Sequence, residues 1–300
     1  MNINKIALIG YGEVGQVLAA DLAVRTQAAI AAFDIKFDDG HSSPSKAIAN
    51  SAARKTASTS ACVIDADIAI SAVTAASTVA AAQAASAALK KGAWYFDLNS
   101  ASPAAKAKAS AAIEQAGGRY IEASVMSPIE PKRLAAPILL GGRHAREFES
   151  VAADFGFSDA KFYSAIQGKT AAAKLCRSVV IKGMEALISE SLLAARHYGV
   201  EDDVIASLEN LFPHPNWREH ARYMISRTLQ HGTRRAEEMQ EAARTVADAG
   251  IDPWMANATV MRQAYAASLD MDGAVDELDQ LLAVIHTQAA KKNKKLEMTR

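Results

Sequence analysis

The sequence has no excess of charge of either sign. Its 33 lysine and arginine residues balance 33 aspartate and glutamate residues, so the formal net charge is zero. Proteins that bind nucleic acid or anionic lipid normally carry a basic excess, and we therefore expect neither partner. No apolar run approaches the roughly 20 residues that a membrane span needs, and the first residues show no signal-peptide pattern. These absences predict a cytoplasmic protein.

Cysteine is equally scarce. Cys62 and Cys176 are the only two in the chain, which is too few for a disulfide framework, and neither has the spacing of a metal ligand. We expect no metal. Half of the residues are hydrophobic, which excludes a disordered chain. At roughly 150 residues per domain, the length of 300 residues predicts two domains.

The first half of the chain alternates short apolar runs with alanine-rich helical runs. Strands are predicted at 3–9, 30–34, 68–73, 94–98, 120–125, 138–140 and 161–166. The run Ile3–Ile9 is almost continuously apolar, as expected for the centre of a parallel sheet that is buried on both faces. Strand–helix alternation of this kind predicts right-handed crossovers and an α/β, Rossmann-type, doubly wound, mostly parallel sheet.

The pattern changes after Gly168, and everything beyond it is predicted to be helical. A long helix runs over 170–198 and ends at Gly199, as a helix does at a C′ glycine. Further helices are predicted at 201–211, 216–230, 233–249, 254–268 and 273–290, with breaks at Pro213, Pro215, Gly232, 250–253 and Gly273. We therefore divide the chain into an α/β domain, 1–167, and an all-α C-terminal domain, 168–300.

A glycine-rich turn follows the first strand and opens the first helix. Residues 10–15 read G-Y-G-E-V-G, which fits G-x-G-x-x-G. The first glycine permits the tight turn, the second lets the backbone approach a pyrophosphate, and the third lets the helix pack on the strand. The amino terminus of the helix then offers N–H groups to the phosphates. In this setting the motif predicts a dinucleotide-binding domain over 1–167.

Asp34 closes the second strand. A carboxylate at that place accepts hydrogen bonds from the ribose hydroxyls of NAD and repels the 2′-phosphate of NADP. We therefore favour NAD as the cofactor. Lys36 lies two residues further on and offers a charge that neutralises a phosphate, so NADP stays possible.

Lys174 and Ser178 lie near the start of the long helix, four residues apart and thus on one face. Ile181 and Glu185 fall within about 20° of Lys174 on the same stripe. A helical lysine is ordinarily a solvated surface residue. Here the helix starts beside the predicted cofactor cleft, where a partly desolvated lysine would have a lowered pKa and would pass protons.

Four segments in this order carry a resemblance to a known family. They are the turn at 10–15, the run D-L-N-S-A-S-P at 97–103, the run E-A-S-V-M-S-P at 122–128, and Gly168 with Lys174 and Ser178. Together they resemble the β-hydroxyacid dehydrogenases, the superfamily of 3-hydroxyisobutyrate and 6-phosphogluconate dehydrogenases. The second half resembles a branch whose C-terminal helical domain has no settled function.

The resemblance implies roles for individual residues. Lys174 matches the catalytic lysine, Ser100 matches a serine or threonine near the nicotinamide and substrate, and His231 stands where the family usually has a second lysine near the nicotinamide. The residues implied to hold the cofactor are Gly10, Tyr11, Gly12, Glu13, Val14, Gly15, Asp34, Val73, Thr74, Ser100 and His231. If the chain is such a dehydrogenase, we expect the substrate to be held by Asn99, Ser100 and Ser127 at its polar end, by Ser178 at its hydroxyl, and by His231, Arg234 or Arg235 as a counter-charge.

Three departures from the family pattern bear on the substrate. Met126-Ser127-Pro128 replaces serine-glycine-glycine in the substrate loop, and Pro128 has no N–H to offer a carboxylate. Ser178 replaces an asparagine. His231-Gly232 replaces a lysine–aspartate pair. These departures leave the prediction of hydride transfer intact, but they weaken any prediction of which acid is the substrate.

The sequence thus predicts an NAD(P)-dependent dehydrogenase of a small β-hydroxy acid or related hydroxy-carbonyl compound, with Lys174 as general acid and base. Two other reactions of the fold stay open, oxidative decarboxylation and imine reduction. The 6-phosphogluconate enzymes, which decarboxylate, have an acidic glutamate seven residues after the lysine, where this chain has Ile181. Imine reductases of this fold generally lack the lysine, which is present here. Both facts count against these two reactions. A non-catalytic NAD-binding protein is a third alternative. We expect a homodimer formed through the helical domain, because its helices offer more apolar faces than one small sheet covers.

Overall fold

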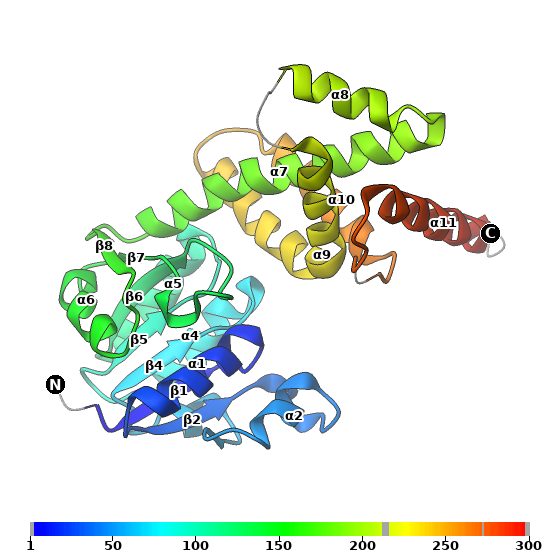
Figure 1. The fold of residues 1–300 in the computed structure, drawn as a ribbon. Coiled ribbons are helices and arrows are strands. Elements are labelled where there is room, and N and C mark those ends of the chain that lie inside the picture. Colours follow the sequence, from blue (N-terminus) through cyan, green and yellow to red (C-terminus); the bar gives the residue numbers. More distant parts are fainter. Residues whose placement is uncertain (1–2, 212–215, 272, 298–300) are drawn as a thin grey trace. The chain divides into compact units, whose positions relative to one another are not determined.

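The computed structural model describes residues 3–211, 216–271 and 273–297. The chain forms two compact units, Met1–Leu175 and Cys176–Arg300 (Figure 1). Helix α7 (Lys169–Tyr198) begins in the first unit and continues into the second. Within the described ranges, no helix combines the length and the apolar character needed to cross a bilayer.

An eight-stranded sheet forms the centre of the first unit, in the order β3-β2-β1-β4-β5-β6-β7-β8. The strands are β1 (Lys5–Ile9), β2 (Ala29–Phe33), β3 (Arg54–Lys55), β4 (Ile68–Ser71), β5 (Trp94–Asp97), β6 (Arg119–Val125), β7 (Ile138–Gly141) and β8 (Ala160–Ser164). All neighbouring strands pair in parallel except β6 and β7, which are antiparallel. The predicted α/β fold class, with its mostly parallel sheet, is confirmed.

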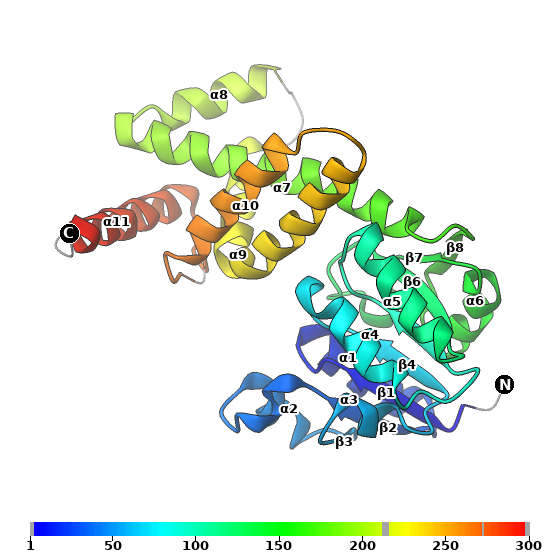
Figure 2. The same ribbon diagram turned by 180° about the vertical axis from the view of Figure 1, so that it is seen from behind.

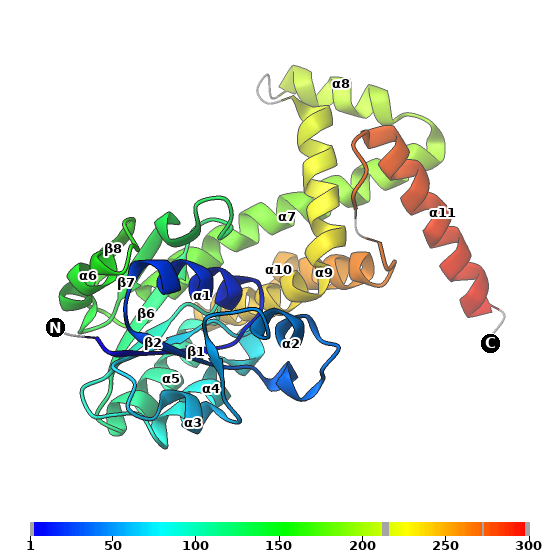
Figure 3. The same cartoon turned by 60° about the horizontal axis from the view of Figure 1, so that its bottom comes forward.

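Helices cover both faces of this sheet, as Figure 3 shows and as Figure 2 shows from behind. One face buries Ile6, Leu8 and Phe96 against α1 (Glu13–Arg25) and α6 (Ala145–Asp154). The other face packs against α3 (Thr59–Val63), α4 (Thr78–Ser86) and α5 (Pro103–Gln115). The remaining helix, α2 (Ser43–Ile48), follows β2 in the chain. Because β1 and β5 are buried on both faces, their sequences are nearly all apolar.

A polar row interrupts the apolar packing on the second of these faces. Ser71, Asp97 and Glu122 are register partners on β4, β5 and β6, and all three are fully buried. Paired residues on neighbouring strands point to the same face of a sheet. The row therefore lies across three adjacent strands, and buried polar groups of this kind must find hydrogen-bond partners.

The second unit is helical. It contains the rest of α7 with α8 (Glu201–Leu211), α9 (Trp217–Asp248), α10 (Trp254–Ala267) and α11 (Leu278–Glu297). Its core includes Leu192 from α7, Ile225 from α9 and Leu281 from α11. Gly199, with φ of 69°, ends α7 as predicted. Pro213 and Pro215 lie outside the described residues.

The predicted break at Gly232 is wrong, because α9 runs through this position without interruption. A Cβ atom at Gly232 would come within 2.7 Å of the carbonyl oxygen of Gln263 on α10. Glycine is present here because α9 and α10 approach each other closely, not because the helix ends.

Candidate functional site

The carboxyl ends of β1, β4, β5 and β6 meet at one edge of the sheet, because these strands are parallel. The predicted segments 10–15, 73–74, 99–100 and 126–128 follow these four strands. In open α/β sheets the crevice at this edge is where ligands bind. The fold thus brings together the predicted site residues of the first unit.

The glycine turn has the shape that a dinucleotide requires. Gly10 has φ of 95°, and a Cβ atom there would lie 2.4 Å from the carbonyl oxygen of Ala72. A Cβ atom at Gly15 would lie 2.2 Å from the carbonyl oxygen of Gly10. At Gly12, by contrast, a Cβ atom would meet nothing within 4 Å. The fold itself therefore needs Gly10 and Gly15, whereas the space beside Gly12 at the start of α1 is open, as the binding of a pyrophosphate would require.

Asp34, which was predicted to bind the ribose, is hydrogen-bonded to the glycine turn. Its carboxylate accepts the backbone N–H of Tyr11 at 2.7 Å and that of Lys36 at 2.8 Å. The Tyr11 ring is buried beside Phe37. Each carboxylate oxygen keeps a lone pair beyond the bond it already accepts. Asp34 therefore shapes the turn and still has acceptor capacity for a ribose hydroxyl.

Asn99 joins the ends of two strands. Its amide oxygen accepts the N–H of Val73 at 2.7 Å, and its amide nitrogen donates to Ser71 at 3.0 Å. Its side chain is almost completely buried. Thr74, by contrast, is exposed, and its hydroxyl lies 3.3 Å from that of Ser77. The predicted substrate residue Asn99 thus holds Val73 in place and presents little surface of its own.

Lys174 and Ser100 come together across 74 positions of sequence. Nζ of Lys174 donates a hydrogen bond of 2.6 Å to Oγ of Ser100, and both side chains are partly buried. Ser178 follows Lys174 by four residues on α7 and is also partly buried. The predicted proton carrier thus has a polar hydroxyl beside it at the edge where β5 ends.

The loop after β6 offers few backbone donors. The N–H of Met126 already donates to the carbonyl oxygen of Pro137 at 2.8 Å, and Pro128 has none. Ser127 donates its hydroxyl to the carbonyl oxygen of Pro128 at 2.9 Å. In this loop, neither Met126 nor Pro128 has a backbone N–H left to offer to a ligand.

Glu122 is a residue of this site whose role the sequence did not reveal. This fully buried carboxylate accepts four hydrogen bonds from the start of α7 and from the residues just before it. These contacts tie the start of α7 to the sheet within the first compact unit, Met1–Leu175. The only sequence signal was a carboxylate in a run of strand residues, four positions before Met126.

In the helical unit, Arg235 is already paired. It forms a buried ion pair with Glu185 of α7. Burial raises the pKa of Glu185, and Arg235 works against this rise. Burial also lowers the pKa of Arg235. An arginine held in this way is a structural link between α7 and α9.

His231 lies one turn before Arg235 on α9 and is partly buried. Burial is the main cause that lowers its pKa to about 4, and the neighbouring Arg227, Arg234 and Arg235 add to the effect. At neutral pH the imidazole is uncharged. Arg234 is exposed. His231 was predicted to offset a negative charge on the substrate, but it carries no positive charge at neutral pH.

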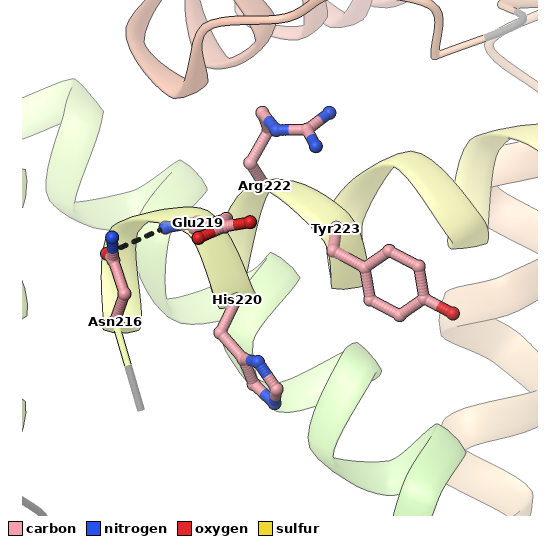
Figure 4. Close-up of a pocket in the computed structure, with 5 residues that line it drawn as sticks. All are labelled: Asn216, Glu219, His220, Arg222 and Tyr223. Atoms are coloured by element: carbon pink, nitrogen blue, oxygen red, sulfur yellow. Dashed lines mark hydrogen bonds between the residues drawn. The ribbon is translucent and has the colours of Figure 1, made fainter. Parts of the chain in front are cut away.

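A shallow cleft opens at the amino-terminal end of α9. As Figure 4 shows, it is lined by Asn216, Glu219, His220, Arg222 and Tyr223, and the side chain of Asn216 caps the helix through the N–H of Glu219. None of the predicted site residues lines this cleft. Among the described residues, no three histidine, cysteine, aspartate or glutamate side chains are grouped as metal ligands.

Two family models match the chain. Residues 5–156 match the NAD-binding domain of 6-phosphogluconate dehydrogenase. Residues 195–265 match a family described as a domain of unknown function, DUF1932. A comparison with curated proteins finds no match.

Several solved structures are similar over nearly the whole chain. A conserved hypothetical protein from Sinorhizobium meliloti 1021 is 33% identical, with a TM-score of 0.72, over 96% of this chain and 97% of its own. A conserved protein of unknown function, described as structurally similar to 3-hydroxyacid dehydrogenases, is 28% identical, with a TM-score of 0.66, over 90% and 100%. The 3-hydroxyisobutyrate dehydrogenase of Mycobacterium tuberculosis, solved with L-serine, shares the fold at 18% identity and a TM-score of 0.66, over 95% and 99%.

Proposed function

Because the chain belongs to the family of the NAD-binding domain of 6-phosphogluconate dehydrogenase, we propose that it is a dehydrogenase with Lys174 as its proton carrier. The reaction would transfer a hydride between a nicotinamide cofactor and a small β-hydroxy acid or related hydroxy-carbonyl compound. The observation that carries this proposal is the hydrogen bond of 2.6 Å between Lys174 and Ser100 at the carboxyl edge of the sheet.

The residues present fit a dinucleotide. The turn at 10–15 leaves room for a pyrophosphate in front of α1, and Asp34 has acceptor capacity for the ribose hydroxyls. Ile35, next to Asp34, has an exposed fraction of 76% and is an apolar side chain that would contact the adenine ring. The negative charge of Asp34 opposes a 2′-phosphate, which supports NAD over NADP.

The proton transfer is assigned to the chain's own residues. When bound, the oxidised cofactor supplies the hydride acceptor. The amine of Lys174, in its neutral form, takes the proton of the substrate hydroxyl as the C–H bond of the carbinol carbon breaks. Ser178, one turn further along α7, orients that hydroxyl, and Ser100 and Ser127 hold the polar end of the substrate. In the reverse direction, the ammonium of Lys174 returns the proton.

An acidic group on the substrate would need a counter-charge, and the sequence suggests His231, Arg234 or Arg235 for it. The N–H of Met126 is occupied, Pro128 has none, Arg235 is paired with Glu185, and His231 is neutral at pH 7. Arg234, which is exposed on α9, stays a predicted counter-charge.

A screen of substrates tests the proposal. Purified protein is incubated with short-chain hydroxy acids, their esters and their sugar-acid relatives, with NAD and with NADP, and formation of the reduced nicotinamide is followed by absorbance. Turnover of at least one compound that disappears in Lys174→Ala supports the proposal. Tight cofactor binding without turnover of any compound would favour a non-catalytic NAD-binding protein, and turnover of imines alone would favour an imine reductase.

We further propose a homodimer formed through the helical unit. Leu187 on α7 has an exposed fraction of 56%, and Trp254 at the start of α10 has one of 76%. Ile181, Met255 and Met261 are also exposed on these two helices. Exposed apolar side chains on helices favour association, and twofold dimers are the commonest closed assembly.

A further inference from the structure

Glu122 is a buried carboxylate that the proposed reaction does not use. It lies on β6 with no exposed surface. Its Oε1 accepts hydrogen bonds from the Thr170 hydroxyl at 2.5 Å and from the N–H of Ala171 at 2.7 Å. Its Oε2 accepts hydrogen bonds from the Gln167 amide at 2.6 Å and from the N–H of Gly168 at 2.5 Å.

These four donors are neutral, and they come from the first turn of α7 and from the two residues just before it. A buried carboxylate costs free energy unless it is hydrogen-bonded on both oxygens, and here both are. The first N–H groups of a helix have no partner inside the helix and carry the positive end of its dipole. Glu122 therefore acts as an external cap that fixes the start of α7 on the sheet.

The sheet is shaped to receive the helix at this place. Gly141 of β7 is the register partner of Glu122. A Cβ atom at Gly141 would lie 2.8 Å from the side chain of Thr170, so glycine is needed for α7 to come this close. The position of Thr170 and Ala171 on the sheet is thus fixed by the carboxylate of Glu122 on β6 and by the absence of a side chain at Gly141 on β7.

Lys174 follows Thr170 by four residues and Ala171 by three, so it lies on the same side of α7 as these anchored residues. Its amine reaches Ser100. Ser100 is fixed in turn by its neighbour Asn99, which binds Ser71, while the backbone N–H of Asn99 donates to Asp97 at 2.9 Å. Both partners of the Lys174–Ser100 contact are therefore held by the polar row Ser71, Asp97 and Glu122.

We infer that Glu122 is a positioning residue for Lys174. By fixing the start of α7 on the sheet, it sets the position and direction of the Lys174 side chain relative to Ser100. The inference rests on the proposed function only for the statement that Lys174 moves a proton. Displacing a reacting group by about 1 Å costs on the order of 10²-fold in rate. Loss of the cap is therefore expected to lower kcat and to leave cofactor affinity unchanged.

The test measures the reactivity of the Lys174 amine itself, which needs no substrate. Purified wild-type protein and variants are labelled with acetic anhydride, and the rate at Lys174 is read by mass spectrometry against the exposed Lys108 as internal reference. Glu122→Gln is nearly isosteric, but its NH₂ group faces N–H and O–H donors. We expect Lys174 to be labelled about threefold faster or more once its hydrogen bond to Ser100 loosens.

Two further variants keep the inference falsifiable if Glu122→Gln does not fold. Thr170→Val removes one of the four bonds at equal volume and should give a smaller acceleration. Glu122→Asp keeps the negative charge. Its rate of labelling at Lys174 should lie between the rates of wild type and Thr170→Val, or equal that of Thr170→Val. Phe148→Leu, whose ring packs on Trp94 and Phe96, is the control for lost stability and should label Lys174 at the wild-type rate.

Labelling of Lys174 at the wild-type rate in folded Glu122→Gln, or in Thr170→Val where the former does not fold, would overturn the inference. So would an equal acceleration in Phe148→Leu. Once a substrate is found, kcat of Glu122→Gln should fall by about 10–100-fold while the dissociation constant of the cofactor stays within about twofold. If labelling changes as expected but no substrate turns over, the positioning role stands and the proposed function fails.

Discussion

Lys174 on α7 and Ser100 after β5 are joined by a hydrogen bond of 2.6 Å. One lies on a helix and the other in a loop, so strand pairing alone does not bring them together. The contact depends on two separate supports. Asn99 ties the Ser100 loop to the end of β4, and Glu122 ties the start of α7 to β6. A partly buried amine held against a hydroxyl is suited to proton transfer at one defined place.

Replacing Lys174 should abolish most of the activity. For Lys174→Ala we expect kcat on the true substrate to fall by a factor on the order of 10²–10⁴, the range for a positioned acid–base group. Lys174→Arg should not restore it, because a guanidinium stays protonated at any working pH. Ser178→Ala should be milder, since it removes an orienting group only. Steady-state kinetics measure these three variants and the control variant Lys108→Ala. Near-normal kcat in Lys174→Ala would refute the mechanism.

Two glycines of the same turn should respond differently to alanine. Gly12→Ala meets no atom within 4 Å, so the protein should stay as stable as wild type while its affinity for NAD falls about tenfold or more. Gly15→Ala would clash with the carbonyl oxygen of Gly10 and should lower the free energy of unfolding by about 1–3 kcal/mol. Urea unfolding and calorimetric titration with NAD separate the two effects. Unchanged NAD affinity in Gly12→Ala would contradict the placement of the pyrophosphate.

Asp34 should select the cofactor. We expect kcat/KM to be higher with NAD than with NADP, and the ratio to fall about tenfold in Asp34→Asn, which removes the negative charge but keeps an oxygen for the N–H of Tyr11. Lys36→Ala is the matched test of the opposite hypothesis. A wild-type preference for NADP that disappears in Lys36→Ala would show that Lys36, and not Asp34, decides.

His231 should make the helical unit sensitive to acid. Its pKa is about 4 in the folded protein and near 6.5 in an ordinary environment. Between these values the unfolded chain binds a proton that the folded chain does not, so stability is fully present above pH 6.5 and is lost as the pH falls toward 4. With partial burial, we expect a loss of about 1–3 kcal/mol.

His231→Asn provides the control for this pH dependence. Urea unfolding at pH 7 and pH 4.5 should show a smaller difference between the two conditions in the variant than in wild type. Equal differences in the two proteins would mean that the acid sensitivity comes from other groups, such as the buried Glu185–Arg235 pair.

Light scattering at micromolar concentration tests the dimer. We expect about twice the chain mass of 31.8 kDa. Leu187→Lys places a charge on the exposed apolar side of α7 and should shift the protein toward monomer, whereas Val24→Lys changes an exposed apolar residue of α1 and should not. A wild-type monomer would refute the dimer.

The sequence predicts the strands and the glycine turn well, because buried parallel strands and dinucleotide turns leave strong local patterns. It does not predict that β7 runs antiparallel to β6, since Ile138–Gly141 is apolar in either direction. The two-residue β3 is too short to leave a pattern. Gly232 has the same local signal whether it ends a helix or permits a close helix–helix approach, and only the position of Gln263 decides between them.

The sequence suggests candidate site residues where chemistry depends on residue type, as for Lys174, Asp34 and the glycines, and their roles stay predictions. The site is not predictable where a role depends on a partner distant in sequence. Glu122 and Thr170 are 48 positions apart, and nothing near either residue shows that they meet. Arg235 and Glu185 are 50 positions apart, so the sequence could not show that this arginine is already neutralised.

The outermost strand β3 consists of Arg54 and Lys55 alone, and both are exposed. An unpaired sheet edge is a template on which further strands add, and this is the first step of fibrous aggregation. A stretch of two residues offers too few N–H and C=O groups for such growth, and two positive charges repel an identical edge. At this border of the sheet the protein is protected against open-ended polymerisation.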